Sequence, residues 1–180
     1  MTWEWYPDAR IRSYLYPLYL SIPLRIINFL GLDYSSTVRA SYYLAQWVLV
    51  IIGDYFYYQI GCTMIGENAT RLSMYLYISN KFYNIHLIRC FGNSVEAIIY
   101  LVAFHFYNKI TYKFDKNIII FSSLITVSFM MRPTSPIGFI FLVIYKIFKE
   151  NSILSFILTG LTFVIPILFC IISLETYYYN

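Results

Sequence analysis

Charged residues are scarce in this sequence. Only 12% of its 180 residues are Asp, Glu, Lys or Arg, whereas 59% are hydrophobic. That balance is too apolar for an ordinary soluble domain and predicts a polytopic membrane protein. The net charge of +4 is spread along the chain without a basic tract. The sequence therefore argues against nucleic acid as a partner.

Cysteine is also rare, with three residues in the sequence. We expect no signal peptide after Met1. Cys62, Cys90 and Cys170 are odd in number and widely spaced, so they form no metal-binding pattern and we expect no metal site. Apolar packing is their expected role. Tyrosine, in contrast, is abundant, with 20 residues, and its amphipathic ring suits membrane interfaces.

The apolar stretches predict an all-α membrane protein with about six membrane helices, preceded by interfacial helices. The predicted membrane helices cover roughly residues 40–60, 69–87, 94–107, 118–131, 137–147 and 153–174. Pro17 and Pro23 interrupt residues 14–32, which predicts short helices at the interface instead of a span. We therefore expect a lumenal loop at 1–39, a helical bundle at 40–174 and a tail at 175–180.

The densest group of polar side chains lies between the second and third predicted spans: Arg89, Asn93, Ser94 and Glu96. Ionisable residues at membrane depth are functional by default. If the segment is helical, positions 89, 93 and 96 share one face. Alternatively, Gly92 closes one helix and Asn93 caps the next, with Glu96 completing a capping box. The two interpretations are compatible, because a helix N-terminus beside an arginine suits a phosphate.

Three further features are candidates for function or for structure. Asp54 lies inside the first span, where a carboxylate needs a partner and should face other helices. Arg132 opens a sharp turn in which Ser135 is the expected N-cap and Pro136 the first helical residue. His86 and His105 are single histidines on apolar helices, for which packing is more expected than catalysis.

Charge placement predicts the topology. Lysine-bearing loops at 109–116 and 146–149 are two spans apart and belong on the cytosolic side. Arg89 and Arg132 then fall on the lumenal side, where arginines at the membrane surface fit a lipid phosphate. The sequon at Asn68 falls on the cytosolic side, so we expect it to be unmodified.

Four motifs, in matching order over residues 2–145, resemble those of the dolichyl-phosphate-mannose-dependent α-mannosyltransferases of the GT-C fold, glycosyltransferase family 22. Residues near the start of the chain resemble the family's first lumenal loop, namely Trp3, Glu4, Trp5, Arg12 and Ser13. Arg89, Asn93, Ser94 and Glu96 match its Arg-Thr-x-Ser-Asn-(Ser/Thr)-x-Glu motif, and Arg132-Pro133-Thr134 its Arg-Pro-Thr turn. Arg39 and Asp54 fit the span between these motifs.

The resemblance implies a multi-pass enzyme of the endoplasmic reticulum membrane with a GT-C-like helical bundle. It implies transfer of mannose from the lipid-linked donor dolichyl phosphate mannose, with no certain cofactor, to a GPI precursor glycolipid. The motifs are most similar to those of the enzymes that add the third, α1,2-linked mannose. Enzymes that add the fourth mannose, or that extend the N-glycan precursor, are alternatives. A non-catalytic membrane fragment or a transporter-like subunit would instead line a path at the bilayer midplane.

The resemblance also implies roles for individual residues. Arg89 and Arg132, helped by Asn93 and Ser94, would stabilise the leaving phosphate in an inverting transfer. The acceptor groove, or the structure around it, would involve Trp3, Glu4, Trp5, Arg12, Ser13, Asp54 and Glu96. The family's His-Pro-Asp-Glu-like motif, which resembles its catalytic-base site, does not precede Met1. We therefore expect the base upstream of Met1 and the chain to be a fragment.

Overall fold

The computed structural model describes residues 14–89, 92–110, 115–132, 134–150, 157–159 and 164–179, and within these ranges the regular structure is entirely helical. The expectation of an all-α protein is confirmed. The chain divides into two compact units, Tyr16–His105 and the remainder of the chain, and each is described by itself. The first unit holds α1 (Leu15–Phe29), α2 (Ser35–Ile65), α3 (Glu67–Ser79), α4 (Lys81–Ile88) and most of α5 (Gly92–Lys109).

The first helix, α1, is continuous, so the prediction of short interrupted helices is wrong. Pro17 is the third residue of α1, and a backbone N–H in the first turn of a helix has no intrahelical acceptor to lose. Pro23 lies inside the helix. A proline there destabilises a helix by about 3 kcal/mol, which other contacts must offset. Two hydrogen bonds from α1 to α2 help to offset that cost, because the Tyr16 hydroxyl donates to Gln46 and the Tyr19 hydroxyl to the Ala45 carbonyl.

The longest helix, α2, is the one helix in the described part of the chain that is long and apolar enough to cross a membrane. Its 31 residues correspond to about 46 Å at ~1.5 Å per residue, which exceeds the hydrocarbon core of a bilayer. A loop was expected from Gly61, but α2 continues to Ile65. The chain turns instead at Gly66, whose φ of 83° is a conformation that glycine adopts without steric cost.

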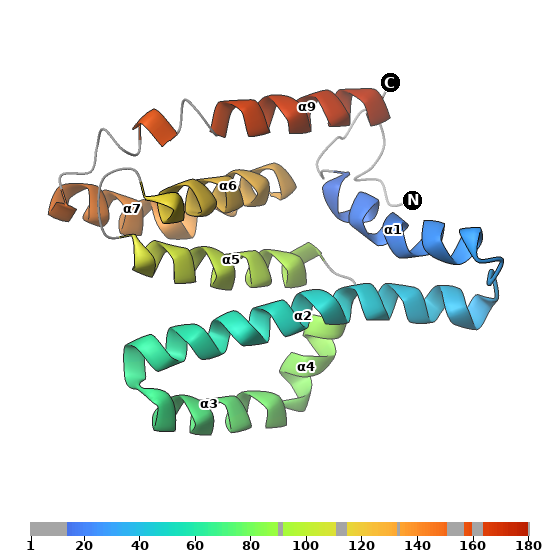
Figure 1. Ribbon diagram of the computed structural model, residues 1–180, viewed down its shortest axis with the longest axis horizontal. Helices are drawn as coiled ribbons and strands as arrows, with labels where there is room; N and C mark the ends of the chain where they lie inside the picture. The colour runs from blue at the N-terminus through green and yellow to red at the C-terminus, as the bar shows by residue number, and fades with distance from the viewer. Residues whose placement is uncertain are drawn as a thin grey trace. The chain divides into compact units, whose positions relative to one another are not determined.

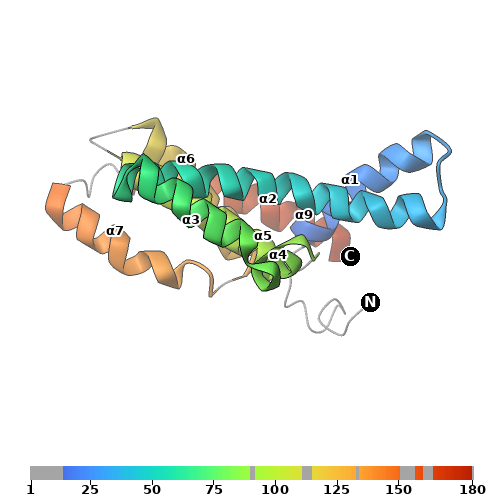
Figure 2. The same ribbon diagram turned by 90° about the horizontal axis from the view of Figure 1, so that it is seen from below.

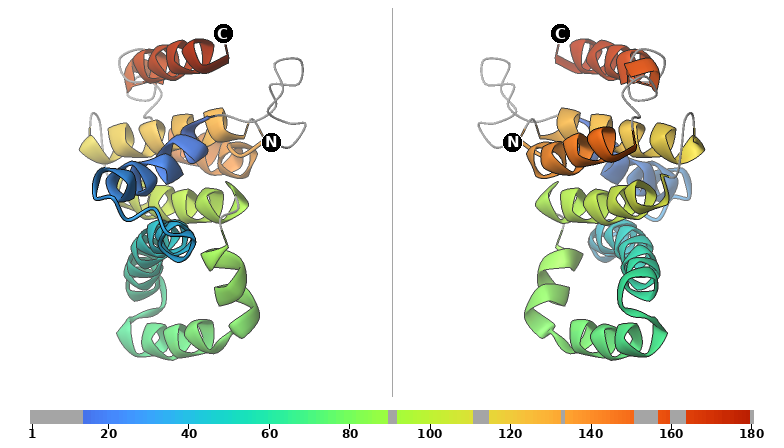
Figure 3. Two further views of the ribbon diagram at one scale, coloured as in Figure 1. Left: turned by 90° about the vertical axis from the view of Figure 1, so that its right-hand side faces the viewer. Right: turned by 90° about the vertical axis from the view of Figure 1, so that its left-hand side faces the viewer.

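The expected second span is two helices instead of one. α3 ends at Ser79 and α4 begins at Lys81, with Asn80 between them. The Asn80 N–H donates to the Tyr77 carbonyl, and the Asn80 carbonyl accepts from the Asn84 N–H. Asparagine favours such boundary positions because its side chain competes with the helical backbone. α3 runs back along α2, and α4 then turns toward α2 (Figures 1, 2 and 3).

Close approach at one glycine fixes the packing of α3 on α2. A Cβ atom added to Gly61 would lie 2.6 Å from Cγ2 of Thr70, and Thr70 itself is fully buried. Further along, the rings of Tyr57 and Tyr77 stack with centroids 4.9 Å apart. The hydroxyl groups of Tyr57 and Ser73 lie 2.6 Å apart. Small residues and hydroxyl hydrogen bonds are the usual means by which helices associate in membranes.

In the second unit, the end of α5 is followed by α6 (Lys116–Met131), α7 (Ile137–Glu150) and α9 (Ile165–Tyr179). α6 and α9 pack against each other (Figure 1). Edge and tilted ring contacts join Phe121 to Tyr107 and to Phe139, so aromatic side chains fill the space between α5, α6 and α7. The predicted end of the fourth span at Met131 and start of the fifth at Ile137 are confirmed.

Lys146 was expected in a loop, but it lies inside α7 and is buried. Its ammonium group donates to the Tyr107 carbonyl at 2.9 Å and lies 4.8 Å from the centre of the Tyr107 ring. A lysine thereby satisfies a carbonyl in the last turn of α5, where a positive charge also complements the helix dipole. The contact joins the end of α5 to α7, and the predicted membrane topology stays a prediction.

The last predicted span, residues 153–174, ends before the helix α9 does. α9 extends to Tyr179, so residues 175–179 are helical where a tail was expected. Much of the predicted start of this span, at residues 153–156 and 160–163, lies outside the described residues. Besides α2, two shorter apolar helices occur, at Lys116–Met131 and Ile165–Leu174. The count of six spans therefore stays a prediction.

Candidate functional site: two turns that carry arginine

Arg89 lies in the turn between α4 and α5, and its side chain is exposed. α4 ends at Ile88 and α5 begins at Gly92, so the predicted single helical face through positions 89, 93 and 96 is wrong. Asn93 and Glu96 do share α5, where Asn93 is exposed and Glu96 half-buried. Cys90 and Phe91, which connect Arg89 to α5, lie outside the described residues.

The predicted capping box is also wrong. Gly92 is the first residue of α5 and is not among the glycines with positive φ, so it does not adopt the left-handed conformation of a helix-closing residue. Asn93 then lies within the first turn of α5 and not at its cap. This places the N-terminal amides of α5 close in sequence to Arg89, and such amides favour a phosphate as a neighbour.

Ser94 supports the turn from the α5 side. Its hydroxyl donates to the His86 carbonyl at 2.9 Å, and the residue is 7% exposed. The last carbonyls of a helix have no intrahelical donor, so this bond satisfies one of them at the end of α4. The predicted contact of Ser94 with a donor phosphate is untested and stays a prediction.

Gln46 supports the same turn from α2, and the sequence interpretation missed it. The side chain is fully buried, and its amide nitrogen donates to the Leu87 carbonyl at 2.9 Å. Its amide oxygen accepts from the Tyr16 hydroxyl at 3.0 Å. One signal was present in the sequence, because a lone amide within an apolar span is costly unless it is hydrogen-bonded.

Arg132 follows α6 in an extended conformation, with φ of −158°, and its side chain is exposed. Its N–H donates to the Ser128 carbonyl, and its carbonyl accepts from the Ser135 N–H. Below the turn, the hydroxyl groups of the buried residues Ser128 and Ser135 are hydrogen-bonded to each other. α7 begins at Ile137, so Pro136 precedes the helix and is not its first residue. Pro133 lies outside the described residues.

The other candidates have varied surroundings. Asp54 accepts a hydrogen bond from the Tyr77 hydroxyl on α3 at 2.9 Å, which confirms that it faces a neighbouring helix. His105 is buried with its ring edge-to-face against Phe56, and packing was its expected role. Among the described residues, no three His, Cys, Asp or Glu side chains gather as metal ligands do. The predicted lumenal-loop residues lie outside the described ranges: Trp3, Glu4, Trp5, Arg12 and Ser13.

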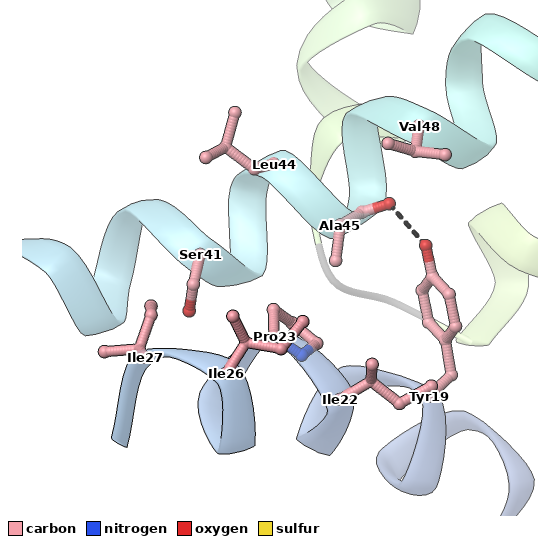
Figure 4. Close-up of a pocket in the computed structure, with 9 residues that line it drawn as sticks. All are labelled: Tyr19, Ile22, Pro23, Ile26, Ile27, Ser41, Leu44, Ala45 and Val48. Atoms are coloured by element: carbon pink, nitrogen blue, oxygen red, sulfur yellow. Dashed lines mark hydrogen bonds between the residues drawn. The ribbon is translucent and has the colours of Figure 1, made fainter. Parts of the chain in front are cut away.

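An apolar groove of about 360 Å³ lies between α1 and α2. Figure 4 shows Tyr19 at one end, with its hydroxyl donating to the Ala45 carbonyl, and Ile27 near Ser41 at the other. Burial raises the pKa of the Tyr19 phenol above its ordinary value, so this group stays a neutral donor. The groove holds no charged side chain.

The turns that carry Arg89 and Arg132 thus have similar local structures. In each, an exposed arginine follows the end of a helix, and buried polar side chains hold the backbone around it. Arg89 belongs to the first unit and Arg132 to the second, so their convergence on one ligand stays a prediction.

Comparison with known proteins identifies the family. The sequence matches the Alg9-like mannosyltransferase family over residues 1–180. The chain belongs to this family. The resemblance drawn from its motifs is therefore confirmed at the level of the family.

Several curated relatives of known name are similar to it. Mannosyltransferase APTG1 of Arabidopsis thaliana is 25% identical over 172 residues, 93% of this chain and 30% of the relative. GPI alpha-1,2-mannosyltransferase 3 of Bos taurus is 28% identical over 158 residues, 88% of this chain and 29% of the relative. The Homo sapiens protein of the same name is 28% identical over 137 residues, 76% of this chain and 24% of the relative.

The chain thus spans between 24% and 30% of the length of these curated relatives. No solved structure matches it significantly.

Proposed function

We propose that the protein transfers mannose from dolichyl phosphate mannose to a GPI-anchor precursor, adding the third, α1,2-linked mannose at the lumenal face of the endoplasmic reticulum membrane. The observation that carries this proposal is family membership over residues 1–180, together with relatives that are named GPI alpha-1,2-mannosyltransferase 3. Lipid-linked donor and glycolipid acceptor are substrates that suit a multi-pass membrane protein with an exposed apolar helix.

The part of the reaction that this chain supports is stabilisation of the leaving phosphate. As the bond between mannose and dolichyl phosphate breaks, negative charge grows on the phosphate oxygens, and fixed donors lower the barrier by binding that charge. The guanidinium group of an arginine offers a planar fork of donors that matches a phosphate. Arg89 and Arg132 carry exposed guanidinium groups on held turns, and we assign them this role.

Neighbouring groups at the α4–α5 turn assist Arg89 in the proposal. Asn93 and Ser94 lie in the first turn of α5, where free backbone N–H groups and the positive end of the helix dipole favour an anion. Glu96 lies one turn further along α5, and Asp54 is engaged by Tyr77. We assign both acidic residues structural or acceptor-groove roles.

Complementation tests the proposal. The intact protein is expressed in yeast cells that lack the enzyme for the third GPI mannose, and lipid-linked GPI intermediates are analysed after mannose labelling. We expect the two-mannose intermediate to disappear and GPI-anchored proteins to be restored. Rescue only of cells that lack the fourth-mannose enzyme, or only of cells deficient in N-glycan mannosylation, would instead assign a different acceptor. Absence of rescue in all three strains, with the protein present in membranes, would contradict the proposal.

A further inference from the structure

Two side chains from different helices bind the C-terminal end of α4. Backbone carbonyls in the last turn of a helix lack an intrahelical donor, yet two consecutive ones here are satisfied. The His86 carbonyl accepts from Ser94 of α5, and the Leu87 carbonyl accepts from Gln46 of α2. The backbone that leads into Arg89 is therefore held from two directions.

Gln46 is the more deeply buried of these two supports. Its exposed fraction is 0%, and both ends of its amide are used, one by Leu87 of α4 and one by Tyr16 of α1. The partners are 41 and 30 residues away in sequence. A buried amide with both ends bonded is fixed in orientation, so it transmits the position of α2 to the end of α4.

We propose that Gln46 is a positioning residue for Arg89, a role that rests on the proposed function of Arg89 at the donor phosphate. By bonding to the Leu87 carbonyl, two residues before Arg89, the Gln46 amide fixes where the guanidinium group meets the phosphate. Precise placement matters for such a group, since a displacement of about 1 Å can cost a factor of ~100 in rate. Gln46 itself does not contact the substrate in this proposal.

A double-mutant cycle in the intact protein tests the role. Gln46→Met keeps the side-chain volume but removes the donor to Leu87 and the acceptor for Tyr16. Transfer from radiolabelled dolichyl phosphate mannose is measured in membranes as kcat/KM for the donor, per amount of protein. We expect Gln46→Met to lower kcat/KM about tenfold when Arg89 is present. In the Arg89→Ala background we expect a change below about twofold, because residues that act as a unit are not additive.

Tyr16→Phe is the matched control. It removes the hydroxyl that donates to Gln46 but leaves the bond from Gln46 to the Leu87 carbonyl and the aromatic ring of residue 16. We expect kcat/KM to stay within about twofold of the unsubstituted protein, because the bond from Gln46 to the Leu87 carbonyl, which supports the end of α4, is kept. A loss equal to that of Gln46→Met would overturn the proposal, because support of α4 would then not be the function of the amide.

Other outcomes are equally decisive. An equal loss from Gln46→Met in both backgrounds, or no loss in either, would overturn the proposal. If Gln46→Met does not accumulate in membranes, Gln46→Glu goes through the same cycle, because a carboxylate keeps the acceptor for Tyr16 and lacks the donor for Leu87. A wild-type rate for Arg89→Ala alone would refute the proposed role of Arg89, which separates that failure from failure of Gln46 to act through it.

Discussion

Several polar side chains inside the helices of the first unit have a defined partner. Asp54 accepts from Tyr77, Gln46 bonds to both Tyr16 and Leu87, and the Thr70 hydroxyl donates to the Gly66 carbonyl. Moving an amide or hydroxyl group from water into apolar surroundings without a hydrogen bond costs roughly several kcal/mol. Stability at the residue scale therefore depends on these pairs.

The pair of Asp54 and Tyr77 gives a direct prediction. Tyr77→Phe keeps the ring that stacks on Tyr57 but removes the hydroxyl that donates to Asp54. We expect the free energy of unfolding in detergent micelles to fall by about 1–3 kcal/mol, because the half-buried Asp54 carboxylate loses its hydrogen-bond donor. Tyr75→Phe is the control, since Tyr75 lies on the same helix with its side chain 72% exposed. An equal effect of both substitutions would contradict the account.

The contact of Gly61 with Thr70 gives a second prediction. Gly61→Ala places a methyl group 2.6 Å from Thr70 Cγ2, so the Thr70 side chain or the two helices must shift. Overpacking of this kind costs about 1–3 kcal/mol of unfolding free energy. Gly138→Ala in α7 is the control, because a Cβ there has nothing within 4 Å. If Gly61→Ala left stability unchanged, or if its effect simply added to that of Thr70→Ala, the close contact would be wrong.

Predictions for single residues succeeded where they depended only on the chemistry of the residue itself and of its neighbours in the sequence. Asp54 was predicted to need a partner on a neighbouring helix because of its charge alone. Gln46 was missed, since its importance depends on partners that lie 30 and 41 residues away and that no local pattern brings together. Gly92 and Asn93 were assigned to a capping box, but the helix includes both residues.

Among the elements, α2 has the clearest relation to a membrane. One side of it exposes large apolar side chains, including Leu44, Trp47 and Ile51, which lipid can cover. The opposite side carries Gln46 and Gly53, which contact other helices of the unit. Asp54 lies at the edge of the exposed side, where the Tyr77 hydroxyl of α3 donates to it. This division is what a membrane span requires, since polar groups must be satisfied by protein.

The exposed side of α2 gives a third prediction. Ile51 lies near the middle of the helix and is 60% exposed, whereas Ile65 is its last residue and is 58% exposed. We expect Ile51→Lys to disfavour membrane insertion by about 2.5–3.5 kcal/mol, and Ile65→Lys by much less, because a lysine near a helix end reaches the interface. Insertion into microsomes measures both. Equal insertion of the two variants would contradict the assignment of α2 as a span.

Helix ends were predicted well where a residue, such as proline, strongly prefers the boundary of a helix. The turn after Met131 follows from Arg132-Pro133, and α7 begins near the position that Pro136 suggests. Pro17 and Pro23 misled the interpretation, because a proline in the first turn costs little and tertiary contacts with α2 offset the second. Asn80 divides α3 from α4 although the surrounding sequence is apolar enough for one helix.

For the whole molecule, the proposed orientation in the membrane is testable through Asn68. This asparagine is exposed in the first turn of α3, so it is sterically open to modification. We expect it to carry no glycan, because the lysine distribution places this end of α3 in the cytosol. Endoglycosidase treatment of the expressed protein checks this. A mobility shift that Asn68→Gln abolishes would invert the topology and remove Arg89 and Arg132 from the lumenal side.

Our central proposal is that Arg89 and Arg132 each contribute to stabilising the leaving phosphate. The most direct measurement is the rate of mannose transfer from dolichyl phosphate mannose to the GPI precursor by the intact protein, compared with Arg89→Ala, Arg132→Ala and Arg71→Ala. The first two are expected to lower kcat/KM by a factor of about 10²–10³, as loss of one transition-state donor does. Arg71 forms a surface ion pair with the exposed Glu67, so its removal should leave the rate unchanged. Equal rates for all four proteins, or no mannose transfer by any of them, would contradict the account.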